Sequence, residues 1–217
     1  MARESHLAPC SLHLVPCTFS PGDYLGRKKG HLIVVSGPSG AGKTTLIERL
    51  VREDSNMLFS VSYTTREKRK NEIHGKDYYF TDETTFRRMI DEDGFLEWEP
   101  VHGYLYGTPI KEIAQSIDEG RDIILDIDVK GALKVKEKCP AACLIFLEPP
   151  SVEELKKRLS LRGEKEIEKR MDRVREEMAK KPFFTYAVKN DNVDRAYQQF
   201  QSIIRSVRGQ ENGKDYC

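Results

Sequence analysis

The stretch LIVVSGPSGAGKTTLIERLVRE, residues 32–53, decides the fold. It begins with a short apolar run typical of a buried strand, continues through the glycine-rich segment 37–45 and ends in a helical pattern. The segment matches the phosphate-loop pattern G-x-x-x-x-G-K-[ST], in the strand-then-helix context that makes such a match specific. Glycines let successive backbone N–H groups curve around phosphates, and the helix N-terminus adds its positive dipole. We therefore predict a site for a nucleoside triphosphate.

The residues of this loop have separate expected roles. Lys43 is expected to reach the β- and γ-phosphate oxygens of ATP, and Thr44 to place its hydroxyl on a nucleotide-bound Mg²⁺. The predicted ATP-binding residues of the loop are Gly37, Pro38, Ser39, Gly40, Ala41, Gly42, Lys43, Thr44 and Thr45.

Two further apolar runs, IILDI (123–127) and CLIFL (143–147), are each followed by turn and helix signals. Thr108 and Pro109 predict a cap and a first-turn proline for a helix that ends at Gly120. Near-continuous apolar strands that alternate with helices predict an α/β fold, a P-loop NTPase-type parallel sheet with helices on both faces.

The composition excludes several classes of protein. Charged residues make up 33% of 217 residues and sum to only +1, so no basic field indicates a nucleic-acid partner. The apolar runs are shorter than the roughly 20 residues that a membrane span needs. Five cysteines, without a CxxC pair, predict reduced thiols in a cytoplasmic protein. Five histidines without metal-ligand spacing predict no zinc site.

Two insertions interrupt the alternation of strands and helices. Residues 59–107 contain short strand patterns around one helix, TDETTFRRMIDED. Residues 151–181 are dense in charge, and Ser151 with Glu154 forms a capping-box signature there. The apolar stripe of this second insertion, at residues 167, 171, 174 and 178, is narrow. It predicts either a mobile element that closes over a site or a solvated helical hairpin without a special role.

These patterns divide the chain into an ordered domain, 31–207, between two extensions. Residues 1–30 are expected to form a disordered extension without a role in the chemistry; a targeting leader or a start codon placed too early stays open. Residues 208–217 are expected to form a tail. Within the domain, the expected core comprises residues 31–58, 108–150 and 182–207.

Polar side chains outside the phosphate loop predict a second ligand. Arg66 and Arg69 are suited to clamp a phosphate, because guanidinium binds phosphate oxygens bidentately, and Tyr78 offers a phenolic hydrogen bond. Glu97 is suited to guanine, which presents adjacent donors at N1 and N2, whereas adenine presents none at N1.

Carboxylates also follow the second apolar run. Asp126 and Asp128 stand where that strand is expected to end, at the same edge of the sheet as the phosphate loop. They are candidates to orient Mg²⁺ through water or to bind the second substrate, with capping of the next helix as the simpler alternative.

Six motifs in order resemble the guanylate kinase family over residues 31–207. They are SGPSGAGKTTL, SVSYTTREKR, GKDYYF, FLEWEP with YGTP, ILDIDVKG and PPSVEELKKRL. The resemblance implies phosphorylation of GMP by ATP with Mg²⁺ as the cofactor, a GMP-binding region around 59–107 and a helical lid around 151–181. It leaves the use of dGMP and the oligomeric state open.

The resemblance also implies roles for single residues. The guanine would contact Ser62, Glu97 and Thr108, with help from Asp128. The GMP phosphate would contact Arg66, Arg69, Tyr78 and Tyr106, with Gly107 beside them. Arg158 and Arg170 would reach the transferring phosphoryl group from the lid and act with Lys43 as the catalytic residues, and Asn190 would lie near the adenine.

The chain departs from the family pattern at the lid tip, where residues 163–168 are fewer than usual, and before Asn190, where Lys189 ends an otherwise apolar run. Arg162 is therefore carried over less securely than the other two lid arginines. Two alternatives stay open: a scaffold-type domain that binds phosphorylated peptides, and a kinase of another mononucleotide. The intact phosphate loop and lid arginines disfavour the first, and Glu97 with Ser62 disfavours the second.

Overall fold

The computed structural model describes residues 29–101, 103–161 and 167–209. Its core is a five-stranded, wholly parallel sheet, and the three apolar runs form its three central strands, as predicted. The strand order is β2 (Met57–Phe59), β7 (Asp122–Asp126), β1 (Leu32–Ser36), β8 (Cys143–Glu148) and β9 (Tyr186–Lys189). Because β1 pairs with β7 in parallel, its last residues lie beside Asp126, and the phosphate loop follows at the same edge.

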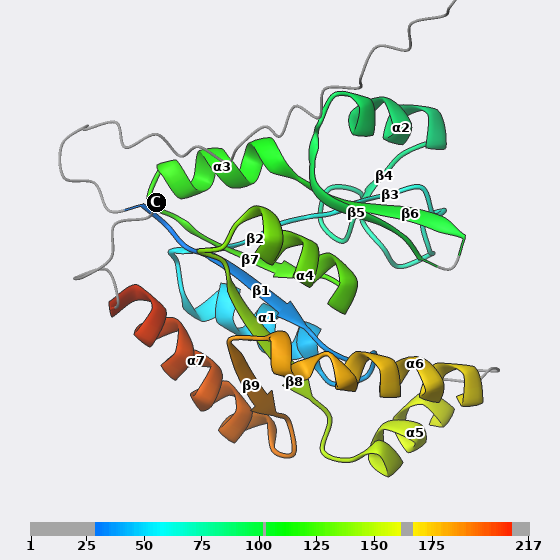
Figure 1. The fold of residues 1–217 in the computed structure, drawn as a ribbon, viewed down its shortest axis with the longest axis vertical. Coiled ribbons are helices and arrows are strands. Elements are labelled where there is room, and N and C mark those ends of the chain that lie inside the picture. Colours follow the sequence, from blue (N-terminus) through cyan, green and yellow to red (C-terminus); the bar gives the residue numbers. More distant parts are fainter. Residues whose placement is uncertain (1–28, 102, 162–166, 210–217) are drawn as a thin grey trace, which may run out of the picture.

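Helices cover both faces of this sheet because alternate residues of each strand point to opposite sides. Ile33 and Val35 of β1 pack on α1 (Lys43–Glu53) and α7 (Val193–Gly209). Leu32 and Val34 pack on the other side, against α3 (Ile110–Asp118) and α4 (Val129–Lys138). Figure 1 shows the two helix layers with the sheet between them. The predicted fold class is confirmed.

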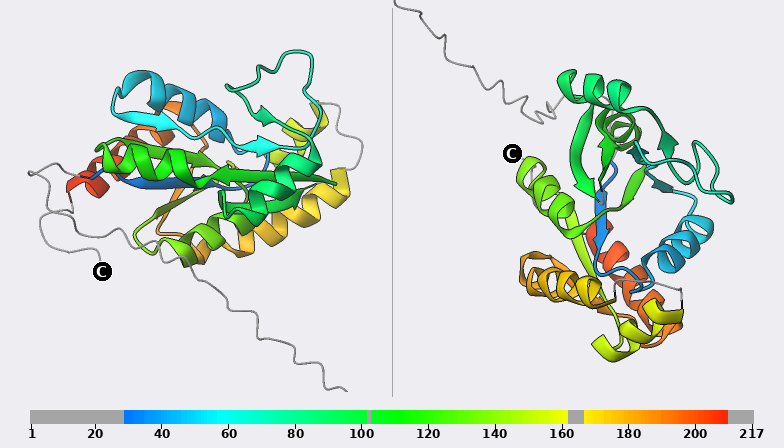
Figure 2. Two further views of the ribbon diagram at one scale, coloured as in Figure 1. Left: turned by 90° about the horizontal axis from the view of Figure 1, so that it is seen from above. Right: turned by 90° about the vertical axis from the view of Figure 1, so that its right-hand side faces the viewer.

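The two insertions form separate substructures. The first is a four-stranded sheet in the order β4 (Tyr79–Phe80), β3 (Tyr63–Thr64), β6 (Tyr104–Pro109) and β5 (Phe95–Val101), with α2 (Glu83–Asp91) beside it. The second is a pair of helices, α5 (Val152–Leu161) and α6 (Ile167–Ala179), followed by a short 3-10 helix, Lys181–Phe183. Both lie near the end of the core sheet to which β1 points (Figures 1 and 2). No helix in the described parts of the chain is long and apolar enough to cross a lipid bilayer.

The apolar stripe of the second insertion packs α6 on α5. Met171 and Val174 of α6 and Leu155 of α5 are buried together, and Ile167 and Met178 extend the cluster. At the start of α5, the backbone N–H of the third helical residue donates to the Ser151 hydroxyl over 3.0 Å, so the predicted cap is present. The cluster is small and separate from the two clusters of the core, and the motion of this helix pair as a lid stays a prediction.

One predicted helix start was wrong. Helix α3 begins at Ile110 with Pro109 as its N-cap, so Thr108 does not cap the helix. The Thr108 hydroxyl instead donates to the Glu97 carboxylate across the β5–β6 ladder. Gly120 follows the helix with a φ of 82°, which confirms the predicted stop.

The described part of the chain extends past both expected ends of the domain. Lys29 forms an ion pair of 3.2 Å with Asp118, and the Gly30 N–H donates to the Ile117 carbonyl over 2.8 Å. A Cβ on Gly30 would lie 1.8 Å from the Arg121 carbonyl oxygen, so this close approach requires glycine. Helix α7 continues to Gly209.

Asp122 joins both ends of the domain at the edge of the sheet opposite the phosphate loop. Its carboxylate is buried and accepts from the His31 backbone and ring over 2.8 Å each and from Arg208 Nε over 2.6 Å. Arg208 also contacts Asp54 over 2.7 Å. Burial by itself would raise the pKa of Asp122, but the hydrogen bonds from His31 and Arg208 outweigh it and lower that pKa.

Replacement of Asp122 by asparagine is expected to lower the free energy of unfolding by about 2–3 kcal/mol, because it leaves a partly buried guanidinium without its closest carboxylate. Because the pKa of Asp122 is lowered in the folded state, ionised Asp122 stabilises the fold at pH values above about 4, the usual carboxyl pKa. This stabilisation is lost as the pH falls through the pKa of Asp122 in the folded state. The gap between the wild-type protein and the variant should therefore narrow below about pH 4. Urea unfolding followed by Trp98 fluorescence measures both effects.

Asp118→Asn is the matched control. Asp118 forms an exposed pair with Lys29, so its loss should change stability by less than about 1 kcal/mol. Equal destabilisation by the two variants would contradict the role assigned to Asp122.

Candidate active site

The phosphate loop connects β1 to α1 through three glycines with positive φ, namely 138° at Gly37, 88° at Gly40 and 94° at Gly42. A Cβ on Gly37 would lie 2.2 Å from the Leu147 carbonyl oxygen, so glycine is required there. Gly42 is the N-cap of α1 and has no side chain to cap the helix. The first N–H groups of α1 are therefore left to an anion.

Lys43, the first residue of α1, turns back over the loop. Its Nζ donates to the Gly37 carbonyl over 2.7 Å and to the Pro38 carbonyl over 3.4 Å. It also lies 3.9 Å from Asp126 Oδ1 at the end of β7. Burial raises the pKa of Asp126, and the Lys43 ammonium opposes this rise. The structure thus brings together two residues that the sequence placed at one sheet edge.

The Asn190 side chain binds the backbone of the phosphate loop. It is buried, and its side-chain amide donates to the Ala41 carbonyl over 2.7 Å. A Cβ on Gly42 would lie 2.3 Å from the same amide nitrogen. The described contact of Asn190 is therefore with the phosphate loop, and the contact with adenine stays a prediction.

A buried carboxylate faces the start of α4 from the second sheet. Glu97 of β5 is 5% exposed, and its Oε1 accepts from the Thr108 hydroxyl of β6 over 2.5 Å. A Cβ on Gly131 would lie 2.7 Å from Glu97 Oε2, which shows how closely α4 approaches. Asp128, the N-cap of α4, accepts from the Gly131 N–H over 2.7 Å. The structure brings Glu97, Thr108 and Asp128 together and shows Asp128 in the helix-capping role that was its simpler alternative; their contacts with guanine stay predictions.

The ionisation of Glu97 is shifted into the physiological range. Its pKa is raised to about 7, chiefly by burial and further by the carboxylates of Asp128 and Glu99. The Thr108 hydrogen bond and the Lys134 ammonium act in the opposite direction. N–H donors from a ligand would stabilise the ionised form of this buried carboxylate.

Arg66 and two tyrosines form a second cluster. Arg66 Nε donates to the Tyr106 hydroxyl over 3.2 Å, and the guanidinium carbon lies 5.6 Å from the centre of the Tyr78 ring. The two tyrosine rings meet edge to face at 5.7 Å. Burial raises the pKa of Tyr78, and the neighbouring Tyr106 and Asp126 raise it further, so the phenol stays a neutral hydrogen-bond donor.

Glu72 belongs to this cluster, and the sequence did not reveal it. Its carboxylate accepts from the two Arg66 terminal nitrogens over 2.7 and 3.0 Å and from the Arg69 backbone N–H over 2.8 Å. These bonds, the one from Arg66 foremost, lower the pKa of Glu72. Glu67 and Glu72 both lie in the basic stretch, and no periodicity in the sequence shows which of them binds Arg66. The path of the loop in the structure places the Glu72 carboxylate there.

The family model described as guanylate kinase matches residues 29–207. The chain belongs to the guanylate kinase family. A guanylate kinase of Caldanaerobacter subterraneus subsp. tengcongensis is 47% identical over 181 residues, which cover 82% of this chain and 88% of that protein. One of Clostridium acetobutylicum is 49% identical over 180 residues, covering 82% of this chain and 86% of the relative.

A solved guanylate kinase, from Anaplasma phagocytophilum, has the same fold. It superposes with a TM-score of 0.70 at 31% identity and covers 82% of this chain and 86% of its own. The range matched by the family model contains both the parallel core and the second sheet.

The structure also places the other residues expected from the guanylate kinase motifs, and their contacts with GMP stay predictions. Ser62 lies before β3, where its carbonyl accepts from the Tyr79 N–H over 2.9 Å. The Arg69 side chain is exposed. Gly107 is buried in β6, where a Cβ would lie 2.8 Å from the Phe95 ring, so its described role is packing.

The lid arginines are only partly described. Arg158 lies in α5 and Arg170 in α6, but their side chains are outside the described part of the structure, as are Arg162 and the shortened tip, 163–166. Their catalytic roles stay predictions.

Proposed function

We propose that the chain transfers the γ-phosphoryl group of ATP to GMP and forms ADP and GDP. One observation carries this proposal: a buried Glu97–Thr108 pair, suited to the donors of guanine, belongs to the same domain as a phosphate loop whose helix lacks a side-chain cap. The first site selects the acceptor, and the second holds the donor.

On the donor side, ATP would lie along the loop with its phosphates on the N–H groups of residues 40–45. Lys43 would exchange the loop carbonyls for β- and γ-phosphate oxygens, since an anionic oxygen is the stronger acceptor for an ammonium. Asn190 would keep the loop in this shape through its bond to Ala41.

Mg²⁺ fits the residues at this edge. Thr44 is exposed at the start of α1, and Asp126 offers a carboxylate oxygen 3.9 Å from Lys43 Nζ. A hydroxyl and one carboxylate are the sparse protein ligands expected for an ion held mainly by phosphates and water. When bound, Mg²⁺ would neutralise charge on the phosphate oxygens.

On the acceptor side, guanine N1–H and N2–H would donate to Glu97, with Ser62, Thr108 and Asp128 around the base. The GMP phosphate would lie toward Arg66, Arg69, Tyr78 and Tyr106. Glu72 already holds Arg66 at both terminal nitrogens, so the guanidinium keeps its orientation before the acceptor arrives.

The reaction needs no general base. An oxygen of the GMP phosphate, already anionic, forms a bond to the γ-phosphorus as the bond to the bridging β–γ oxygen breaks, and the electron pair remains on ADP. Catalysis is therefore positioning and charge stabilisation. Lys43 supplies the charge that the structure describes, and Arg158 and Arg170 are expected to add theirs from the lid and to exclude water.

A cytoplasmic location is part of the proposal. Cys143 is buried in β8, where burial raises its pKa to about 12, so it persists as an unreactive thiol that suits a reducing compartment.

ADP formation with MgATP and, separately, GMP, dGMP, AMP, CMP and UMP tests the proposal. Turnover with GMP and little with AMP or the pyrimidine nucleotides is expected. Turnover with AMP or a pyrimidine nucleotide in place of GMP would keep phosphoryl transfer and reject the guanine site. No turnover by a folded protein that binds GMP would favour a binding module.

A further inference from the structure

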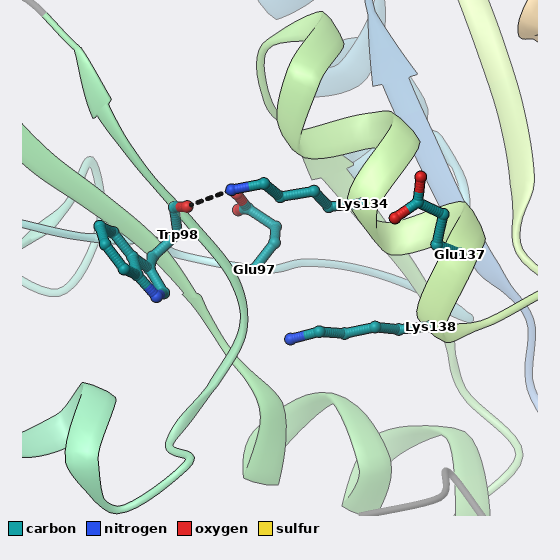
Figure 3. A pocket seen from close by; sticks show the side chains of 5 residues that line it. All are labelled: Glu97, Trp98, Lys134, Glu137 and Lys138. Carbon is teal, nitrogen blue, oxygen red and sulfur yellow. Dashed lines mark hydrogen bonds between the residues drawn. The ribbon is translucent and has the colours of Figure 1, made fainter. Parts of the chain in front are cut away.

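A pocket of about 310 Å³ lies between β5 and α4. Its lining comprises Glu97 and Trp98 from β5 and Lys134, Glu137 and Lys138 from α4. Figure 3 shows the two lysines extending from the helix toward the strand, with Glu97 between them and Trp98 beyond.

Both lysines bind the backbone of β5. Lys138 Nζ donates to the Leu96 carbonyl over 2.6 Å, and Lys134 Nζ donates to the Trp98 carbonyl over 3.3 Å. Lys134 also forms an ion pair of 2.6 Å with Glu99. The carbonyls immediately before and immediately after Glu97 are therefore the ones that α4 binds.

The position of β5 in its sheet explains why donors are needed there. Among the described residues it is an edge strand that pairs with β6 alone, so every second carbonyl points away from the sheet. The two lysines supply the donors that a further strand would have supplied. They are six and ten residues beyond Asp128, so one helix carries both the carboxylate that lies beside Glu97 and the two lysines that bind the strand of Glu97.

We propose that Lys134 and Lys138 are positioning residues for GMP: they hold β5 on α4 and so keep the Glu97 carboxylate against Asp128 and Gly131. This inference rests on the proposed function, because it assigns the lysines to the guanine end of that same site. Neither lysine needs to touch the substrate.

Lys134 has a second effect that packing alone would not produce. Burial, and to a smaller extent the carboxylates of Asp128 and Glu99, raise the pKa of Glu97. The Lys134 ammonium lowers this pKa, as does the hydrogen bond from Thr108. Lys138 and Glu137 are the other charged groups of the pocket. Loss of Lys134 should therefore move the ionisation of Glu97 to higher pH.

The test compares Lys134→Met and Lys138→Met, which keep an apolar stem of similar length and lose the donor. The matched control is Lys136→Met. Lys136 lies on the same helix and also binds two carbonyls, those of Pro140 over 2.6 Å and Ala142 over 2.8 Å, but outside the pocket.

Each pocket variant is expected to raise the KM for GMP by about 10-fold, the scale of one charge-assisted hydrogen bond, with kcat and the KM for ATP within about twofold. The acid limb of kcat/KM for GMP should move to higher pH in Lys134→Met and stay in place in Lys136→Met. Lys134→Arg, which keeps the charge and a donor, should restore most of the affinity.

An unchanged KM for GMP in the folded pocket variants would overturn the proposal, as would an equal rise in the KM for ATP or an equal effect of Lys136→Met. If Lys138→Met does not fold, Lys134→Met carries the test, because the Lys134 side chain is 49% exposed and its loss costs less stability. Turnover of the wild-type protein with GMP in the same assay separates failure of this inference from failure of the proposed function.

Discussion

Lys43→Ala is expected to lower kcat for GMP phosphorylation by about 100-fold or more, as removal of a preorganised charged donor does. Lys43 is the described cation nearest to the loop that would hold the transferring group, and its Nζ already lies 2.7 Å from the Gly37 carbonyl. Its charge becomes most valuable as charge develops on the phosphoryl oxygens, so the loss should appear in kcat more than in the KM for GMP. Steady-state kinetics with both substrates varied measures this division.

The control for this experiment is the fold of the loop itself. Alanine leaves the Gly37 and Pro38 carbonyls without the ammonium, so ATP affinity and thermal stability are measured in parallel. Lys43→Arg keeps the positive charge and tests whether the compact ammonium group of lysine is required. Wild-type turnover in the alanine variant would show that Lys43 has no role in the transfer.

Glu97→Gln is expected to reduce kcat/KM for GMP by about 100-fold or more, because a buried site then presents an amide donor to the donors of guanine. The KM for ATP should stay within about twofold, since Glu97 lies on the second sheet, away from the phosphate loop. Glutamine has nearly the same size and can still accept from Thr108, so the fold should persist. An unchanged KM for GMP would show that Glu97 does not contact the base.

The same variant tests the pH dependence of acceptor binding. Guanine requires the ionised carboxylate, and the pKa of Glu97 in the unliganded protein is about 7. As pH falls through that value the carboxyl takes up a proton, so kcat/KM for GMP should fall below about pH 7, by up to tenfold per unit for a single proton.

The substrate also titrates in this range, because a phosphate monoester takes up a proton near pH 6. Glu97→Gln keeps the titration of GMP and loses that of the enzyme, so the difference between the two profiles belongs to Glu97. Identical profiles would show that Glu97 stays ionised throughout.

The core sheet was predictable because its three central strands are continuous apolar runs, a pattern that few other environments allow. The second sheet was harder to predict, since its strands are short and half exposed, with two residues each in β3 and β4. The start of α3 was wrong by one residue because Thr108 has the local signature of a cap, while a tertiary contact with Glu97 takes its hydroxyl.

Within the site, the residues with a distinctive chemical signature could be named from the sequence. The phosphate loop has a fixed spacing, and a carboxylate with hydroxyls nearby suits a base that presents two adjacent donors. The groups that act through other residues could not be named. Glu72, Lys134 and Lys138 are ordinary charged residues in a chain that is 33% charged, and only the meeting of distant segments distinguishes them.

The position of Arg208 shows that the end of the family match and the end of the folded domain are not the same residue. The family model matches up to residue 207, whereas the ion pairs that join the last helix to Asp54, after the first helix, and to Asp122, at the start of β7, come from the next residue. A chain shortened to the limit of similarity would keep every proposed substrate contact and lose a clasp between its two ends. The residues matched by the family model therefore include every proposed substrate contact, whereas the contacts that stabilise the fold extend at least one residue further.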